Sequence, residues 1–174
     1  GQGSGLGRSM FDCTMEGSAA IALVGALTWW GAFAGSGGVA IWAGASVVVA
    51  TGSCARLDGP TLTNHGTLTV ASPVNDYACI YVSGGSVIEN AGVLTLDGTA
   101  PYYAYLYTNN TGTVHNTGTL TSTGTTAANQ IFSVAVDNDA TLNAPTPPLL
   151  GNGAGVSTGM SCAATAQHVS SGTA

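Results

Sequence analysis

Carboxylates and imidazoles are the side chains of this sequence that could perform acid–base catalysis. Sugar cleavage by paired carboxylates needs two of them to converge on one bond. The candidates Asp58, Asp76, Glu89 and Asp97 do not fall on one column of the repeat described below. Only Glu89 and His115 lie one repeat length apart, and a weak surface ion pair is the simpler interpretation. His65 and His168 have no evident partner.

Other kinds of reactive site are also missing from the sequence. There is no nucleophile elbow for a serine hydrolase, and the glycine-rich stretches lack the strand, GxxxxGK loop and helix that hold phosphate. The four cysteines are too widely spaced for a zinc pattern built on close pairs. We therefore expect no catalytic residue, no metal site and no cofactor, and we expect that the protein is not an enzyme.

The chain that must position these residues has an unusual amino-acid composition. The chain has 174 residues, 26 of them glycine, and contains no lysine and only two arginines, Arg8 and Arg56. Charged residues make up 6%, against about a quarter in typical proteins, and 45% of the chain is apolar. Such a chain suits a single all-β domain with many tight corners. A net charge of −6 argues against nucleic acid as a partner, because little is available to neutralise phosphates.

A repeat with a period of 26 organises the middle of the chain, from residue 60 to about residue 136. Its most regular positions form a corner ladder of Asn64, Asn90 and Asn116 with Gly66, Gly92 and Gly118, followed by Leu68, Leu94 and Leu120. A fixed period in this range predicts a solenoid, because one repeat cannot bury its own apolar face. Asparagines at equivalent corners can then hydrogen-bond from coil to coil, and the glycines complete the turn.

Each coil is predicted to contain three short strands, so we expect a right-handed parallel β-helix with 26-residue coils and irregular terminal arms. Alternation along the strands places Leu68 and its equivalents inside. We divide the chain into an N-terminal arm (1–16), a solenoid domain (17–150) and a C-terminal tail or cap (151–174). The uncharged stretch 19–50 could alternatively span a membrane, but residues 35–38 interrupt it and no Lys or Arg flanks it.

The Asn-x-Gly-Thr-Leu pattern at residues 64–68 and 116–120 resembles the degenerate repeats of β-solenoid surface proteins, such as haemagglutinin-like adhesins and other large secreted solenoids. This resemblance covers less than half of the chain and specifies a fold rather than an activity. It implies a secreted or surface location.

Two outward faces are candidate binding surfaces. The first is aromatic and should mark self-association or ligand contact, because a narrow coil cannot enclose so many rings; its members are Trp29, Trp30, Phe33, Trp42, Tyr77, Tyr81, Tyr103, Tyr105 and Tyr107. The second is a Thr-x-Thr array similar to the water-ordering face of ice-binding solenoids, formed by Thr67, Thr69, Thr95, Thr119 and Thr121 with Val93 as a gap. Threonine is also simply a good strand residue.

The cysteines suggest an oxidising compartment. The separation of Cys54 and Cys79 is close to one repeat, so we predict a disulfide between adjacent coils. Cys13 and Cys162 lie near opposite ends of the predicted column, so they meet within one molecule only if an arm folds back, or else between molecules stacked end to end. Asn109 begins a sequon for N-glycosylation, relevant only in a glycosylating source.

These observations favour an extracellular or cell-surface structural protein. We expect its solenoid ends and apolar faces to associate with further copies into a filament, sheath or surface layer. One alternative is an ice-binding protein that uses the threonine array, and another is a carbohydrate-binding adhesin module that uses the tyrosines. Copies of the same chain are the expected partners and glycans are possible ones, whereas nucleic acid and membrane are not expected.

Overall fold

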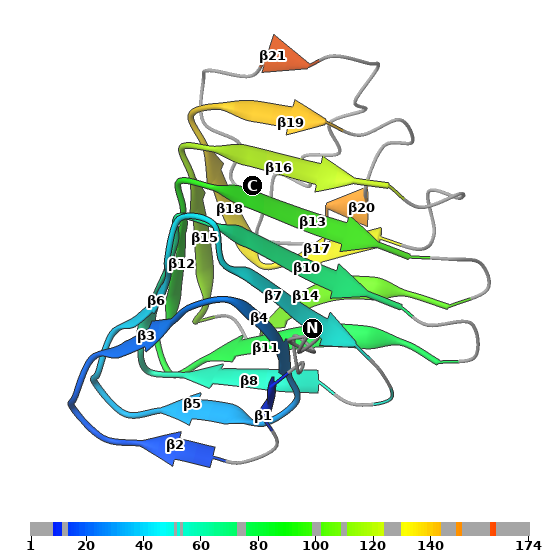
Figure 1. Ribbon diagram of the computed structural model, residues 1–174. Coiled ribbons are helices and arrows are strands. Elements are labelled where there is room, and N and C mark those ends of the chain that lie inside the picture. Colours follow the sequence, from blue (N-terminus) through cyan, green and yellow to red (C-terminus); the bar gives the residue numbers. More distant parts are fainter. Residues whose placement is uncertain are drawn as a thin grey trace, which may run out of the picture.

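The computed structural model describes residues 9–11, 14–50, 52, 54–72, 76–98, 102–108, 111–123, 130–143, 149–150 and 161–162. Within these residues the chain forms strands and no helices, arranged in three parallel sheets. The chain visits the three sheets in turn and adds one strand to each, so successive coils stack as in Figure 1. This is the right-handed parallel β-helix predicted from the repeat.

In the described part of the chain the three sheets have 8, 7 and 6 strands. Sheet A contains β1 (Ser9–Phe11), β4 (Ala26–Trp29), β7 (Ser46–Ala50), β10 (Thr67–Ala71), β13 (Val93–Asp97), β16 (Thr119–Ser122), β19 (Thr141–Asn143) and β21 (Ser161–Cys162). Sheet B contains β2 (Thr14–Glu16), β5 (Ala32–Ala34), β8 (Cys54–Asp58), β11 (Ala78–Ser83), β14 (Ala104–Thr108), β17 (Gln130–Ser133) and β20 (Leu149–Leu150). Sheet C contains β3 (Ile21–Leu23), β6 (Val39–Ile41), β9 (Thr61–Asn64), β12 (Val87–Asn90), β15 (Thr113–Asn116) and β18 (Ala135–Asn138).

The predicted period is confirmed in the central coils, where Leu68 pairs with Leu94 and Leu94 with Leu120. The earlier coils are shorter: Leu27 pairs with Val47 and Val47 with Leu68, so each turn there uses fewer residues than a central one. The strands keep their register through these changes, so the variation in length is taken up by the connections between strands.

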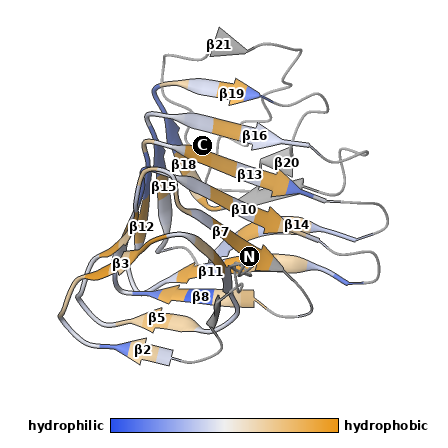
Figure 2. Cartoon of the chain, viewed as in Figure 1, coloured by the Kyte–Doolittle hydropathy of each residue, from blue (hydrophilic) through white to orange (hydrophobic). Residues whose placement is uncertain are grey.

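The core lies inside the coil, between the three sheets, and follows the expected alternation. Leu68, Leu94 and Leu120 are at most 2% exposed, and the hydrophobic colour in Figure 2 recurs from strand to strand of sheet A. The first coils are filled by larger side chains. Trp29 and Phe33 are each 1% exposed, with their ring centroids 5.0 Å apart. The prediction that these two residues belong to an outer aromatic face is therefore wrong.

The solenoid extends into both segments that were expected to be terminal arms. Strands β1 and β2, within residues 1–16, pair with β4 and β5. Strand β21, within residues 151–174, pairs with β19. The uncharged stretch 19–50 forms β3 to β7. None of the described segments is a helix of the length and apolar character needed to cross a membrane.

The asparagine ladder at the corner between sheets C and A is confirmed. Asn64 Nδ2 donates to Asn90 Oδ1 at 2.7 Å, and Asn90 and Asn116 donate in the same way to the asparagine of the next coil. The last acceptor is Asn138, one coil beyond the predicted ladder. All four side chains are at most 3% exposed. Asn64 and Asn90 also donate to backbone carbonyls of the following coil.

The glycines beside the ladder are required for a different reason from the one expected. None of Gly66, Gly92 and Gly118 has a positive φ. Instead, a Cβ at Gly92 would clash with the carbonyl oxygen of Gly66, and a Cβ at Gly118 with that of Gly92. Glycine therefore allows stacked corners to approach closely, rather than allowing a left-handed turn.

We expect Gly92→Ala to lower the free energy of unfolding by about 1–3 kcal/mol, because the added methyl group must push the corners apart. The displaced backbone includes Val93 N–H, which donates to Gly66 O at 2.9 Å. The matched control is Gly38→Ala, where a Cβ meets no atom within 4 Å. Equal stability of the two variants in urea denaturation would contradict this role for Gly92.

Candidate functional site

Two of the ionisable side chains that the sequence singled out, Glu89 and His115, lie with Asp139 in a small surface cluster on sheet C. Glu89 and His115 are direct neighbours on β12 and β15, and His115 Nδ1 lies 2.7 Å from Glu89 Oε2. The other ring nitrogen, Nε2, lies 3.4 Å from Asp139 Oδ2. All three side chains are substantially exposed, at 35–55%. The cluster is an exposed ion-pair network, which agrees with the simpler interpretation of this pair.

The pKa of His115 is raised from its ordinary value of 6.5, first by the hydrogen bond with Glu89 and next by that with Asp139. The folded pKa is thus above the unfolded one, so this group stabilises the fold fully below pH 6.5 and loses that effect as pH rises through the folded pKa. An NMR titration should show the raised pKa, and Glu89→Gln should lower it. An unchanged pKa in that variant would contradict the assignment.

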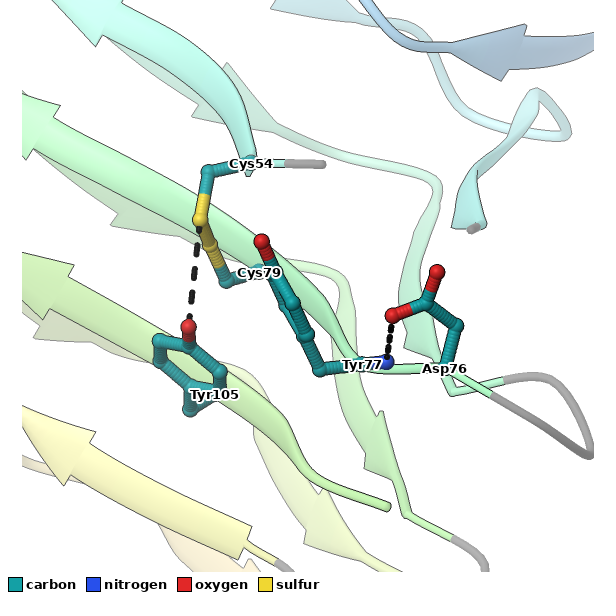
Figure 3. The surroundings of a disulfide bond; sticks show 5 residues. All are labelled: Cys54, Asp76, Tyr77, Cys79 and Tyr105. Carbon is teal, nitrogen blue, oxygen red and sulfur yellow. Dashed lines mark hydrogen bonds between the residues drawn. A yellow bond between two sulfur atoms is a disulfide. The ribbon is translucent and has the colours of Figure 1, made fainter. Parts of the chain in front are cut away.

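The predicted disulfide between Cys54 and Cys79 is confirmed. These residues pair on β8 and β11, with Cα atoms 4.5 Å apart, so the bond joins neighbouring coils. Figure 3 shows Tyr105 from the next coil beside it, with its hydroxyl 4.0 Å from Cys54 Sγ. Cys162 lies on β21, whereas Cys13 is outside the described residues, so their pairing stays a prediction.

The outer side of sheet B carries the tyrosines as predicted, and we call Tyr77, Tyr81, Tyr103, Tyr105 and Tyr107 the tyrosine face. Tyr77, Tyr103 and Tyr107 are 40–45% exposed, and the other two are partly exposed. The rings of Tyr81 and Tyr107 stack with centroids 5.3 Å apart, and those of Tyr77 and Tyr105 lie 6.1 Å apart. Burial raises the pKa of Tyr105, and neighbouring Tyr77 and Tyr107 raise it further.

One aromatic residue of the predicted surface, Trp42, lies on a different part of the solenoid from the tyrosine face. Trp42 is 58% exposed and follows β6, while Val24, 62% exposed, follows β3 in the adjacent coil. The backbone N–H of Trp42 donates to the carbonyl oxygen of Leu23, the residue before Val24. Trp42 and Val24 therefore lie close together at a corner. Trp30 is only partly exposed.

The outer side of sheet A carries the threonine array, which is longer than the sequence repeat indicated. One column runs through Thr28, Val48, Thr69, Thr95, Thr121 and Asn143, and the neighbouring column through Ala26, Ser46, Thr67, Val93, Thr119 and Thr141. We call these two columns the threonine face. The strands from β4 to β19 in this sheet contain one charged residue, Asp97.

Other candidate sites are not brought together. Asp58, Asp76 and Asp97 lie on different strands or connections and do not converge with Glu89. The described residues contain no group of three or more His, Cys, Asp or Glu side chains that could hold a metal ion. Asn109, the predicted glycosylation residue, lies outside the described part of the chain, as does His168.

The fold therefore defines the chain as a parallel β-solenoid protein. A comparison with protein-family models found none that matches the chain. No match was found among curated proteins or among solved structures.

Proposed function

We propose that this chain is an extracellular structural protein that associates with copies of itself through the threonine face. The observation that carries the proposal is a broad, in-register outer surface with almost no charge. Threonine recurs along each column, at the strand spacing of about 4.8 Å. Two such surfaces can pack face to face with their side chains interdigitated, as identical sheets do in other β assemblies.

The near absence of charge on this face favours contact with a second copy. Soluble domains usually carry charged side chains of both signs interspersed over their surface. Among the described strands β4 to β19 of sheet A, Asp97 is the one charged side chain, and it accepts a hydrogen bond from Thr123 Oγ1 at 2.9 Å. Little electrostatic repulsion thus opposes the approach of a second copy. The exposed pair Val24 and Trp42 adds apolar area at the corner between sheets C and A.

An extracellular location is part of the same proposal. It is supported by the disulfide between Cys54 and Cys79, since such bonds persist in oxidising compartments. The resemblance of the Asn-x-Gly-Thr-Leu repeat to those of secreted solenoids points the same way. A rigid column joined by backbone ladders, a buried asparagine row and a covalent bond between coils suits a structural role.

The proposal is tested by placing two positive charges on the threonine face. Thr95→Lys/Thr121→Lys should convert large species into monomer on a sizing column, because like charges would face one another in the assembly. The control is Thr63→Lys/Thr113→Lys, which makes the same changes on sheet C. That sheet already carries the charged residues Glu89 and Asp137 and is not the proposed contact surface. If both double variants elute as the unmodified protein does, the threonine face is not the contact surface.

A second candidate function, ice binding, is favoured by one specific observation on the same face. Thr69, Thr95 and Thr121 are stacked in register, and their hydroxyls form no hydrogen bond within the described part of the chain. These groups are available to order water in a regular array. Ice binding requires the face to be free in solution, so a monomer that inhibits ice recrystallisation would support this function over self-association.

A further inference from the structure

The tyrosine face contains a shallow hollow that the proposed self-association on sheet A does not use. The hollow has a volume of about 560 Å³ and is lined by Cys54, Arg56, Tyr81, Tyr105 and Tyr107. These residues come from three neighbouring strands, β8, β11 and β14. We propose that this hollow binds a neutral saccharide chain, whose rings pack on the tyrosines while its hydroxyl groups bond to the polar side chains at one end.

The aromatic rings form a continuous apolar platform across neighbouring coils. Tyr81 and Tyr107 are in register on β11 and β14, and their rings are inclined by only 28°. Tyr105 lies on the same side of the sheet, two positions before Tyr107 on β14. A pyranose ring presents an apolar C–H face that can lie flat on such a surface, as apolar groups do on aromatic faces. Tyrosine also loses little conformational entropy when it binds a ligand.

Polar groups stand at the β8 end of this platform. Arg56 is the register partner of Tyr81, and its guanidinium carbon lies 5.4 Å from the centre of that ring. Arg56 Nη2 is 3.8 Å from Asp58 Oδ2, so the two groups are close but not tightly paired. The guanidinium offers hydrogen-bond donors and the carboxylate offers acceptors. Adjacent hydroxyl groups of a sugar can accept from the first and donate to the second.

The platform also supplies hydroxyl groups of its own. The hydroxyls of Tyr81 and Tyr107 form no hydrogen bond within the described residues, so they are available to a ligand. The Tyr105 hydroxyl is directed at the disulfide, which fixes β8 against β11 (Figure 3). This hydroxyl is protonated at neutral pH, because the ordinary pKa of tyrosine is 10.0 and burial raises the pKa of Tyr105 above that value. The hollow is therefore a preformed surface that needs little rearrangement, which favours affinity.

Charge decides between a neutral ligand and an acidic one. Arg56 is the one Arg or Lys in the described part of the chain, and Asp58 lies directly beside it. The carboxylate of an acidic sugar would have to approach that aspartate on a protein of net charge −6. A nucleic acid, whose bases could also stack on tyrosine, would meet the same repulsion at each phosphate. A neutral sugar avoids this cost and uses both members of the Arg56–Asp58 pair.

The test is titration calorimetry of the disulfide-bonded protein with neutral tetrasaccharides of glucose, xylose and mannose, alongside a tetramer of galacturonic acid. At least one neutral tetrasaccharide should bind, and the acidic tetramer should not. Tyr107→Ala should weaken the observed binding at least tenfold, whereas Tyr107→Phe, which keeps the ring, should weaken it less. Arg56→Ala should also weaken binding.

The matched control is Tyr103→Ala, which removes a ring of equal size and similar exposure from outside the hollow and should leave affinity unchanged. Thermal melts establish that each variant is folded. Binding of no neutral tetrasaccharide would overturn the proposal. So would a loss of affinity in Tyr103→Ala that equals the loss in Tyr107→Ala, or a preference for the acidic tetramer that depends on Arg56.

Discussion

Asn90→Ala should lower the free energy of unfolding by about 3–5 kcal/mol, because it leaves several buried polar groups without partners. Asn64 Nδ2 loses one of its two acceptors, while Asn116 Oδ1 and Thr119 O each lose a donor. Each buried group left unsatisfied costs about 1–3 kcal/mol. For a chain of this length the loss corresponds to a fall of about 10 °C in melting temperature, which circular dichroism can measure.

The matched control for this variant is Asn143→Ala, which makes the same change at an exposed position of β19. Its free energy of unfolding should change by no more than about 0.5 kcal/mol. Asn138→Ala, at the end of the ladder, should have an intermediate effect, because Asn138 accepts from Asn116 and, within the described residues, donates only to Ala140 O. If Asn90→Ala were as stable as Asn143→Ala, the ladder would not contribute to stability.

Removal of the disulfide should have the second large effect. The bond between Cys54 and Cys79 closes a loop with a sequence separation of 25. Restricting the unfolded chain over such a loop stabilises the folded state by about 3 kcal/mol in the chain-entropy description. Cys54→Ala/Cys79→Ala should therefore melt about 8 °C lower than the oxidised protein.

This experiment is best done with Cys13 and Cys162 replaced by serine, so that only one pair can form. In that background, dithiothreitol should lower the melting temperature of the protein with Cys54 and Cys79 and leave the double alanine variant unchanged. Peptide mapping under non-reducing conditions should recover the two cysteines in one linked fragment. Insensitivity of the first protein to the reductant would contradict a stabilising disulfide.

The central coils could be predicted from sequence because equal spacing repeats the same physical environment. The constant interval returns Asn64, Asn90 and Asn116 to one corner, and strand alternation then places the leucines inside. The ladder's fourth member was missed because the next coil is shorter, so that Asn138 follows Asn116 before a full repeat length has passed. A search for a fixed period cannot detect an equivalent position when the connection between two strands loses residues.

The first coils show a second limit of sequence reasoning. Leu27 is stacked on Val47 at an interval shorter than the repeat, and no single motif residue marks the corners there. The capacity of the interior was also underestimated, because Trp29 and Phe33 occupy it where the repeats carry leucine or valine. Side-chain volume can vary from coil to coil as long as neighbouring coils fill the remaining space.

The candidate binding surfaces were predictable in part. Alternation correctly placed Tyr77, Tyr81 and Tyr107 outside, and the disulfide followed from a separation close to one repeat. The hollow beside Arg56 was missed, although Arg56 and Tyr81 each lie two residues after a cysteine of the predicted pair and are therefore in register on β8 and β11. The length of the threonine face was hidden because its first members on β4 and β7 join it at shorter intervals than the repeat.

The measurement that tests the central claim most directly is electron microscopy of the oxidised protein across a range of concentrations. Self-association through the threonine face predicts regular filaments or sheets for the unmodified protein and for Thr63→Lys/Thr113→Lys. It predicts dispersed particles for Thr95→Lys/Thr121→Lys. A uniform field of monomers of 17.1 kDa for the unmodified protein at every concentration would contradict the claim, and ice binding by the free face would then be tested first.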